Sequence, residues 1–147
     1  MVLEDQNGNL LGARIATDGQ WRFPSTGPVP KRFAIALTTF EDRRFYQHLG
    51  IDPIGIGRAI QQNFKNRKIV SGGSTLTMQT IRMARNKNSR SFFQKLIEAI
   101  QATRLELTYS KEKILSLYSA NAPFGGNVVG LNAASWRYYG KQPDQLS

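Results

Sequence analysis

The segment Phe40-Glu41-Asp42-Arg43-Arg44-Phe45-Tyr46-Gln47-His48-Leu49-Gly50-Ile51-Asp52 gathers carboxylates, arginines, aromatic rings and the one histidine of the chain within a few positions. Apolar residues recur at helical spacing from Phe33 to Leu37, behind Pro30. Proline is favoured in the first turn of a helix, so this pattern predicts an apolar helix that ends near Glu41.

Glu41 is the first candidate catalytic residue. Phe40 and Phe45 flank it in the sequence, and we expect them to desolvate its carboxylate partly. Such an environment suits a group that exchanges protons near neutral pH. The alternative is a structural carboxylate at a helix end, paired with Arg43 or Arg44.

The composition indicates one ordinary domain with a core. The chain has 147 residues, of which 40% are hydrophobic, and it contains neither a secretory signal nor an apolar run that could span a bilayer. The absence of cysteine excludes disulfides and thiolate metal sites.

The charge distribution indicates an anionic partner. The net charge is +10, from 20 Lys and Arg against 10 Asp and Glu. No acidic residue occurs from Pro53 to Ile97, a span that we call the basic block and that carries Arg58, Lys65, Arg67, Lys68, Arg82, Arg85, Lys87, Arg90 and Lys95. Nucleic acid, anionic lipid and a phosphorylated substrate all fit this charge.

The periodicity predicts strands first and helices afterwards. Val2 to Phe23 is typical of strands, with turn signals at Asn7-Gly8 and Asp18-Gly19. The helices expected after Pro30 include one that begins at Pro53, one capped by Ser74 that ends near Arg85, one from Ser91 to Thr108, one capped by Ser110, and one from Val128 to Tyr139 that stops at Gly140. The expected inward-facing residues are Ile56, Ile60, Phe64, Phe93, Leu96, Ile97, Ile100 and Leu105.

The second notable stretch is Ser71-Gly72-Gly73-Ser74-Thr75-Leu76-Thr77-Met78-Gln79. A Gly-Gly turn that leads into a Ser-capped helix presents free N–H groups and hydroxyls at a helix N-terminus, which is a geometry that binds anions. The alternative is an ordinary N-cap after a flexible loop. The spacing of a Walker A loop is absent.

Two further features are weaker. Lys95 and Glu98 are three positions apart and share a helix face, which is also the spacing of an ordinary surface salt bridge. His48 alone fits a structural hydrogen-bonding role better than that of a general base or a metal ligand.

Taken together, these stretches resemble the signature motifs of the peptidoglycan glycosyltransferases, the glycosyltransferase family 51 domains of class A penicillin-binding proteins. The matching segments, in order, are Glu41-Asp42-x-x-Phe45-x-x-His48-x-Gly50, Gly72-Gly73-Ser74-Thr75-Leu76-Thr77-x-Gln79, Lys95-x-x-Glu98, Lys111-x-x-Ile114-Leu115-x-x-Tyr118, and Gly130-x-x-Ala133-Ala134-x-x-Tyr138-Tyr139-Gly140-Lys141. Ala122-Pro123-Phe124-Gly125-Gly126-Asn127 and Asp18-Gly19-x-Trp21-Arg22 look most like the penicillin-binding protein 1C branch. The sequence departs from the family pattern at Gln94, Met78, Ser119 and Ala120.

The resemblance implies a mainly α, lysozyme-like helical domain with a small N-terminal β-hairpin element. It implies an N-terminal β element and loop over residues 1–29, followed by a glycosyltransferase domain over residues 30–147 that is truncated at its C-terminus and has no transpeptidase domain. It also implies a place on the outer, periplasmic face of the cytoplasmic membrane, anchored by a segment outside this sequence.

The implied reaction is the polymerisation of lipid II into β-1,4 glycan strands with inversion and with release of undecaprenyl diphosphate. Glu41 would be the general base and Glu98 the second catalytic carboxylate, which would orient the donor sugar or hold a divalent cation such as Mg²⁺ or Mn²⁺. The candidates for binding the diphosphate and sugar are Arg58, Ser74, Thr75, Gln79, Arg82, Arg90, Lys95 and His48.

The implied partners are lipid II, the growing lipid-linked strand, the membrane surface and inhibitors of the moenomycin type, with no nucleic acid. The nearest alternative enzyme is a lysozyme-like muramidase or lytic transglycosylase, which also uses two carboxylates but requires no diphosphate clamp. An alternative of a different class is a basic nucleic-acid-binding module, which would bind DNA in a salt-dependent way.

Overall fold

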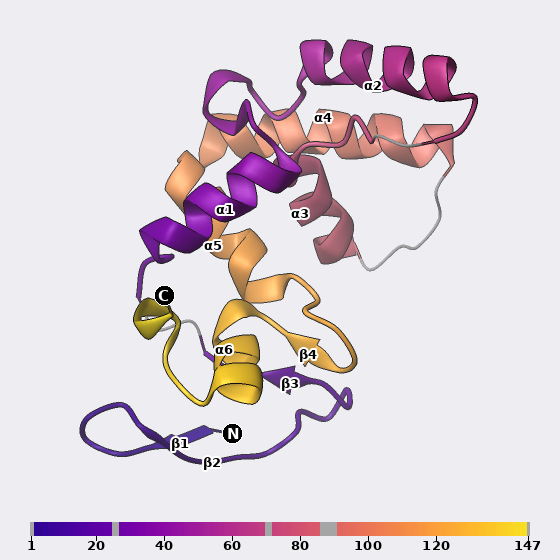
Figure 1. Cartoon of the computed structure of the whole chain (residues 1–147). Coiled ribbons are helices and arrows are strands. Elements are labelled where there is room, and N and C mark those ends of the chain that lie inside the picture. Colours follow the sequence, from indigo (N-terminus) through magenta and orange to yellow (C-terminus); the bar gives the residue numbers. More distant parts are fainter. Residues whose placement is uncertain (1, 25–26, 70–71, 86–90, 147) are drawn as a thin grey trace. The chain divides into compact units, whose positions relative to one another are not determined.

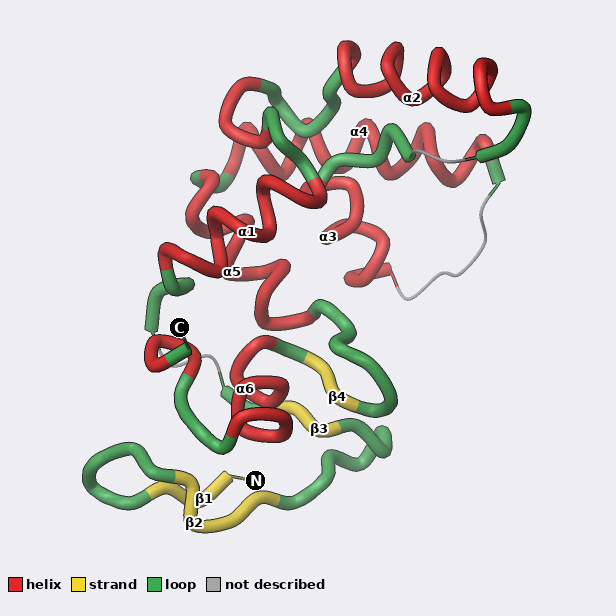
Figure 2. Tube along the Cα trace, viewed as in Figure 1, coloured by secondary structure: helices red, strands yellow, loops and turns green. Residues whose placement is uncertain are grey.

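The fold is mainly helical. The computed structural model describes residues 2–24, 27–69, 72–85 and 91–146, which contain six α-helices and a small antiparallel hairpin (Figures 1 and 2). The helices are α1 (Lys31–Glu41), α2 (Pro53–Asn66), α3 (Leu76–Arg85), α4 (Phe92–Thr108), α5 (Lys111–Asn121) and α6 (Leu131–Tyr139). The strands are β1 (Val2–Glu4), β2 (Leu10–Ala13), β3 (Trp21–Arg22) and β4 (Val128–Val129), and short 3-10 helices cover Phe45–Gln47 and Pro143–Gln145.

The chain forms two compact units. We call Arg32–Leu115 the helical unit, and Met1–Lys31 together with Ser116–Ser147 the mixed unit. The boundary expected between residues 29 and 30 stays a prediction, because compactness groups the first segment with the last one. Among the described residues, no helix is both long enough and apolar enough to cross a bilayer.

In the mixed unit, the first predicted hairpin is confirmed. β1 and β2 pair antiparallel around Asn7-Gly8, and Gly8 has a φ of 78°, which suits glycine. The carboxylate of Asp5 accepts the N–H groups of Asn7 and Asn9 at 2.8 Å and so closes the turn.

The second strand pair differs from expectation. β3 pairs in parallel with β4, a strand from the other end of the sequence, so that Trp21 lies opposite Val128. The prediction that a helix begins at Val128 is therefore wrong, and α6 begins at Leu131 instead. β-branched valines favour a strand, and Gly130, at a φ of 90°, separates it from the helix.

In the helical unit, α1 ends at Glu41, as predicted. α3 packs along α4, and the fully buried side chains Phe45, Leu76 and Met78 lie in the interior. Gly50 has a φ of 83°, and a Cβ atom there would lie 2.6 Å from the carbonyl carbon of Ala102 in α4. Only glycine therefore lets this loop approach α4 so closely.

The expected inward faces of α2 and α4 are wrong in part. Ile60 and Phe64 are 64% and 87% exposed, and Phe93, Leu96 and Ile100 are all at least half exposed. The buried positions are instead Gly55 and Ala59 on α2 and Glu98 and Ala102 on α4. Ile56, Ile97 and Leu105 are half-buried, so the predicted faces are correct at these three positions only.

Candidate functional site

Glu41 is an exposed carboxylate whose hydrogen-bond partner is a neutral amide. Nε2 of Gln79 donates to its Oε2 at 3.0 Å. Arg43 Nε donates to a carbonyl of the preceding helical turn, and Arg44 Nε lies 3.6 Å from Oδ1 of Asp52. In the part of the chain that the structure describes, no ion pair involves Glu41. The alternative prediction, a structural ion pair between Glu41 and Arg43 or Arg44, is therefore wrong.

The expected desolvation of Glu41 by its aromatic neighbours is wrong. Phe40 is 88% exposed, whereas Phe45 is fully buried in the interior of the helical unit. The helix ends between them, so the two rings lie in different environments. Glu41 itself is solvent-exposed.

The residue after Glu41 anchors α3. Oδ2 of Asp42 accepts the backbone N–H of Leu76, the first residue of α3, at 3.0 Å. The buried His48 contacts Oδ1 of the same carboxylate through Nε2 at 3.0 Å. Because an ionised carboxylate only accepts, Nε2 of His48 is the donor in this contact.

Thr75, rather than Ser74, caps α3. Its Oγ1 accepts the N–H of Met78 at 3.2 Å and donates to the carbonyl of Gly50 at 2.6 Å. The prediction that Ser74 is the cap is therefore wrong by one position. The cap and Asp42 together fix the N-terminus of the helix that carries Gln79 to Glu41.

A small pocket brings Glu41 together with three of the predicted binding residues, Arg58, Ser74 and Thr75. Its volume is only ≈ 30 Å³. The full lining is Glu41, Asp42, Arg43, Arg44, Asp52, Gly55, Arg58, Gly72, Gly73, Ser74 and Thr75.

Glu98 forms a bidentate ion pair with Arg82 of the neighbouring helix. Nε of Arg82 donates to Oε1 at 3.0 Å, and Nη2 donates to Oε2 at 2.7 Å. This hydrogen bonding raises the pKa of Arg82. The alternative of a surface salt bridge between Glu98 and Lys95 is wrong, since Glu98 is 4% exposed and its side chain contacts α3.

Of the other three predicted site residues, Lys95 and His48 do not line the pocket beside Glu41. Lys95 is exposed on α4, His48 is buried against Asp42, and Arg90 lies outside the described residues. A network around the buried carboxylate of Glu106 was not predicted from the sequence. Glu106 accepts from Thr77 Oγ1 at 2.6 Å and pairs with Lys111 at 2.8 Å, and Lys111 Nζ also donates to the carbonyl of His48 at 2.7 Å. The only sequence signal for this network was Lys111, which opens the fourth motif.

The residues around Glu98 do not fit a divalent cation. Both of its carboxylate oxygens already accept hydrogen bonds from Arg82. In the described ranges, no group of three or more His, Cys, Asp or Glu side chains could hold a metal ion. A hard cation requires several oxygen ligands, and here the guanidinium of Arg82 already supplies the positive charge beside Glu98.

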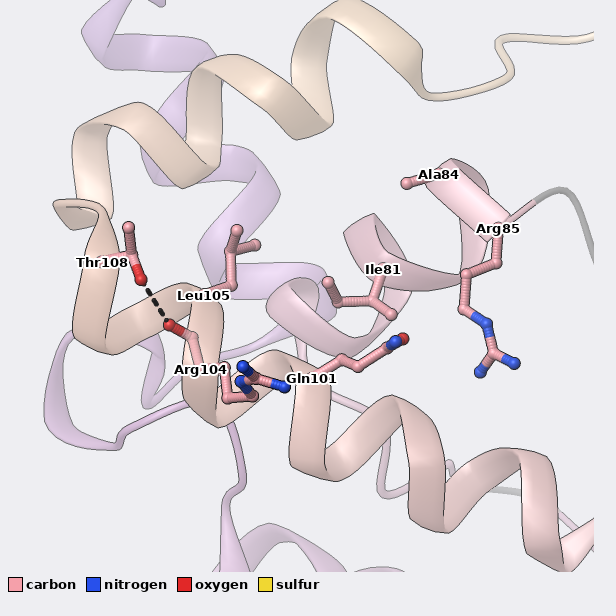
Figure 3. A pocket seen from close by; sticks show the side chains of 7 residues that line it. All are labelled: Ile81, Ala84, Arg85, Gln101, Arg104, Leu105 and Thr108. Atoms are coloured by element: carbon pink, nitrogen blue, oxygen red, sulfur yellow. Dashed lines mark hydrogen bonds between the residues drawn. The ribbon is translucent and has the colours of Figure 1, made fainter.

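A larger pocket lies elsewhere between α3 and α4 (Figure 3). It has a volume of ≈ 390 Å³ and is lined by Ile81, Ala84, Arg85, Gln101, Arg104, Leu105 and Thr108. Its lining includes two arginines and neither candidate carboxylate. The size of a pocket is therefore a poor guide here, because Glu41 lines the smaller pocket and Glu98 lines neither of the two.

The comparisons with known proteins agree with these motifs. The sequence profile described as "Transglycosylase" matches residues 7–147. The chain belongs to the transglycosylase family. It is 42% identical over 147 residues to penicillin-binding protein 1C of Escherichia coli (strain K12), an alignment that covers 99% of this chain and 19% of that protein.

Two other relatives support the same family. Penicillin-binding protein 1F of Bacillus subtilis (strain 168) is 38% identical over 144 residues, which cover 97% of this chain and 20% of the relative. A biosynthetic peptidoglycan transglycosylase of Haemophilus influenzae (strain ATCC 51907 / DSM 11121 / KW20 / Rd) is 33% identical over 146 residues, which cover 99% of this chain and 59% of the relative. This transglycosylase chain therefore spans only part of the length of the proteins it matches.

Proposed function

We propose that this transglycosylase polymerises lipid II, with Glu41 as the general base. The 4-hydroxyl of the acceptor GlcNAc attacks C1 of the donor MurNAc with inversion, a β-1,4 bond forms, and undecaprenyl diphosphate leaves. The observation that carries the proposal is the state of Glu41, an exposed carboxylate that Gln79 holds through one oxygen.

The geometry suits the removal of a proton from a weak nucleophile. A sugar hydroxyl needs a base within hydrogen-bond reach as it attacks. Gln79 fixes Oε2 of Glu41, and among the described residues no hydrogen bond reaches Oε1, so Oε1 is available to the hydroxyl. The partner is an uncharged amide and not a guanidinium, and its hydrogen bond leaves the second oxygen to the hydroxyl.

The basic block supplies the charges for the leaving group. A diphosphate leaves more readily when fixed cations and N–H donors stabilise its developing charge. Arg58 and Ser74 line the pocket beside Glu41, and Arg82 lies on the same helix as Gln79. We assign the diphosphate to Arg82, Lys95 and Arg90, and the acceptor side to Arg58, Ser74 and Thr75.

The rival muramidase chemistry is less well supported. Hydrolysis by a lysozyme-like enzyme uses two carboxylates that flank the scissile bond. Here the second carboxylate, Glu98, is buried and occupied by Arg82, so it is not free to act as an acid on a sugar oxygen.

A membrane surface is the partner that the exposed apolar residues favour. Phe64, Ile69 and Phe92 are each more than 85% exposed, and basic residues such as Lys65 and Lys68 lie beside them in the sequence. Such a mixture of large apolar and basic residues fits the surface of an anionic bilayer. This fits a place at the outer face of the cytoplasmic membrane, where a lipid-linked donor resides.

Incubation of the full-length protein with lipid II, followed by separation of the products, tests the proposal. We expect longer glycan strands and released undecaprenyl diphosphate. Cleavage of preformed peptidoglycan without polymerisation would instead support the muramidase alternative.

A further inference from the structure

We infer that Glu98 is a positioning residue that acts through Arg82 and is not a ligand for a cation. This inference rests on the proposed function, because it assigns the diphosphate to Arg82. Both oxygens of Glu98 accept a hydrogen bond from the same guanidinium, that of Arg82.

The side of the guanidinium that Glu98 uses decides what remains for the substrate. Glu98 accepts from Nε and Nη2, which form the side edge of the planar group. A guanidinium has five N–H donors, so Nη1 and the second N–H of Nη2 remain, and these form its end edge. Two parallel donors on this edge match two oxygens of a phosphate.

Glu98 is more deeply buried than Arg82, as a residue that positions Arg82 for a ligand should be. The side chain of Glu98 is 5% exposed, whereas that of Arg82 is 40% exposed. A buried carboxylate without a partner is costly, so Glu98 keeps its hold on Arg82 when an anion arrives. The buried partner thus fixes the orientation and the exposed partner presents its free edge to the solvent.

α3 connects this pair to the general base. Gln79 precedes Arg82 by three positions, so both lie on one face of the helix. One of them contacts Glu41 and the other contacts Glu98. Because Thr75 and Asp42 fix the start of α3, the base and the diphosphate-binding cation keep a constant spacing.

The test compares Glu98→Gln, Arg82→Lys and the double variant in the full-length protein, with Glu112→Gln as a control that removes an exposed carboxylate from α5. Both single substitutions keep a polar side chain of similar length, which favours folding. The readouts are the affinity for inorganic diphosphate, the KM and kcat for lipid II, and the ¹⁵N signal of Arg82 Nε.

We expect each single variant to weaken diphosphate binding about tenfold, the usual effect of one charge-assisted hydrogen bond. The double variant should be little worse than the weaker single one, because both changes disrupt the same unit. Glu98→Gln should also shift the Arg82 Nε signal without any substrate present, and Glu112→Gln should change none of these values.

Two results would overturn the inference. One is independent, multiplicative losses in the double variant, which would mean that Glu98 contacts the substrate itself. The other is a Mg²⁺ dependence of diphosphate binding that the wild type has and Glu98→Gln loses, which would make Glu98 a metal ligand. If the wild type does not polymerise lipid II, the proposed function fails, while diphosphate binding and the Nε signal still decide the role of Glu98.

Discussion

At the scale of single residues, the two candidate carboxylates differ in their partners, and the different roles proposed for them rest on this difference. Glu41 is exposed and has an amide partner, whereas Glu98 is buried and has a guanidinium partner. The sequence predicted both glutamates as site residues and predicted that Glu41 ends a helix. It could not predict that Glu98 contacts Arg82, because helical spacing reports only on neighbours within one helix, and this contact joins two helices.

Replacing Gln79 tests whether this residue positions Glu41 or binds the substrate. Gln79→Met keeps a similar length but removes the donor to Glu41, so the carboxylate loses its fixed orientation. We expect kcat for lipid II to fall about tenfold, the effect of one hydrogen bond to a carboxylate, with KM nearly unchanged. An unchanged kcat with a raised KM would instead make Gln79 a substrate-binding residue, as the sequence had suggested.

At the scale of elements, the start of α3 is the best-anchored point near the site. The sequence predicted this helix, but it placed the cap at Ser74. Either hydroxyl suits a cap, and the choice depends on Thr75 also reaching the carbonyl of Gly50, which is a contact 25 positions away in the sequence. Long-range contacts of this kind are not visible in local patterns.

The two neighbouring hydroxyls provide a matched pair of variants. Thr75→Ala loses the cap and the bond to Gly50, so the free energy of unfolding should fall by about 1–2 kcal/mol. Ser74→Ala should stay within about 0.5 kcal/mol of the wild type, as is usual away from such features. Urea unfolding measures both, and an equal loss in the two variants would contradict the assignment of the cap.

The apolar faces of α2 and α4 show the limit of periodicity. The spacing of Phe64 and Phe93 is correct for an inward face, but both side chains are exposed. Periodicity reports that a face is apolar and not what covers it. The membrane surface proposed as a partner would satisfy the same pattern that a core would.

Substitution of these phenylalanines tests the membrane surface directly. Phe64→Ser and Phe93→Ser should each weaken binding to anionic vesicles about tenfold or more, since a fully buried Phe contributes about 1.5–3 kcal/mol. Stability should barely change, because neither side chain is buried in the fold. Co-sedimentation with vesicles measures the effect, with Gln61→Ser, an exposed polar position on α2, as the control. Undiminished binding of both variants would exclude this surface.

At the scale of the whole molecule, the fold class was predictable and the pairing of distant segments was not. Helical periodicity after Pro30 and the Asn7-Gly8 turn led to a mainly helical chain with a small hairpin, as observed. The parallel pairing of Trp21 with Val128 joins segments from the two ends of the sequence, and strands this short give little local signal. The helical unit alone contains Glu41, Gln79, Arg82 and Glu98, so the proposed chemistry depends on one compact unit.

The most direct test of the account is the rate of lipid II polymerisation by Glu41→Gln in the full-length protein. Glutamine keeps the size of the side chain but cannot accept a proton, so the rate should fall about 10²–10⁴-fold, the usual contribution of a positioned base. Moenomycin binding, measured in parallel, should stay nearly unchanged, because we assign the diphosphate contacts to Arg82, Lys95 and Arg90. Polymerisation at the normal rate by Glu41→Gln would contradict the central claim.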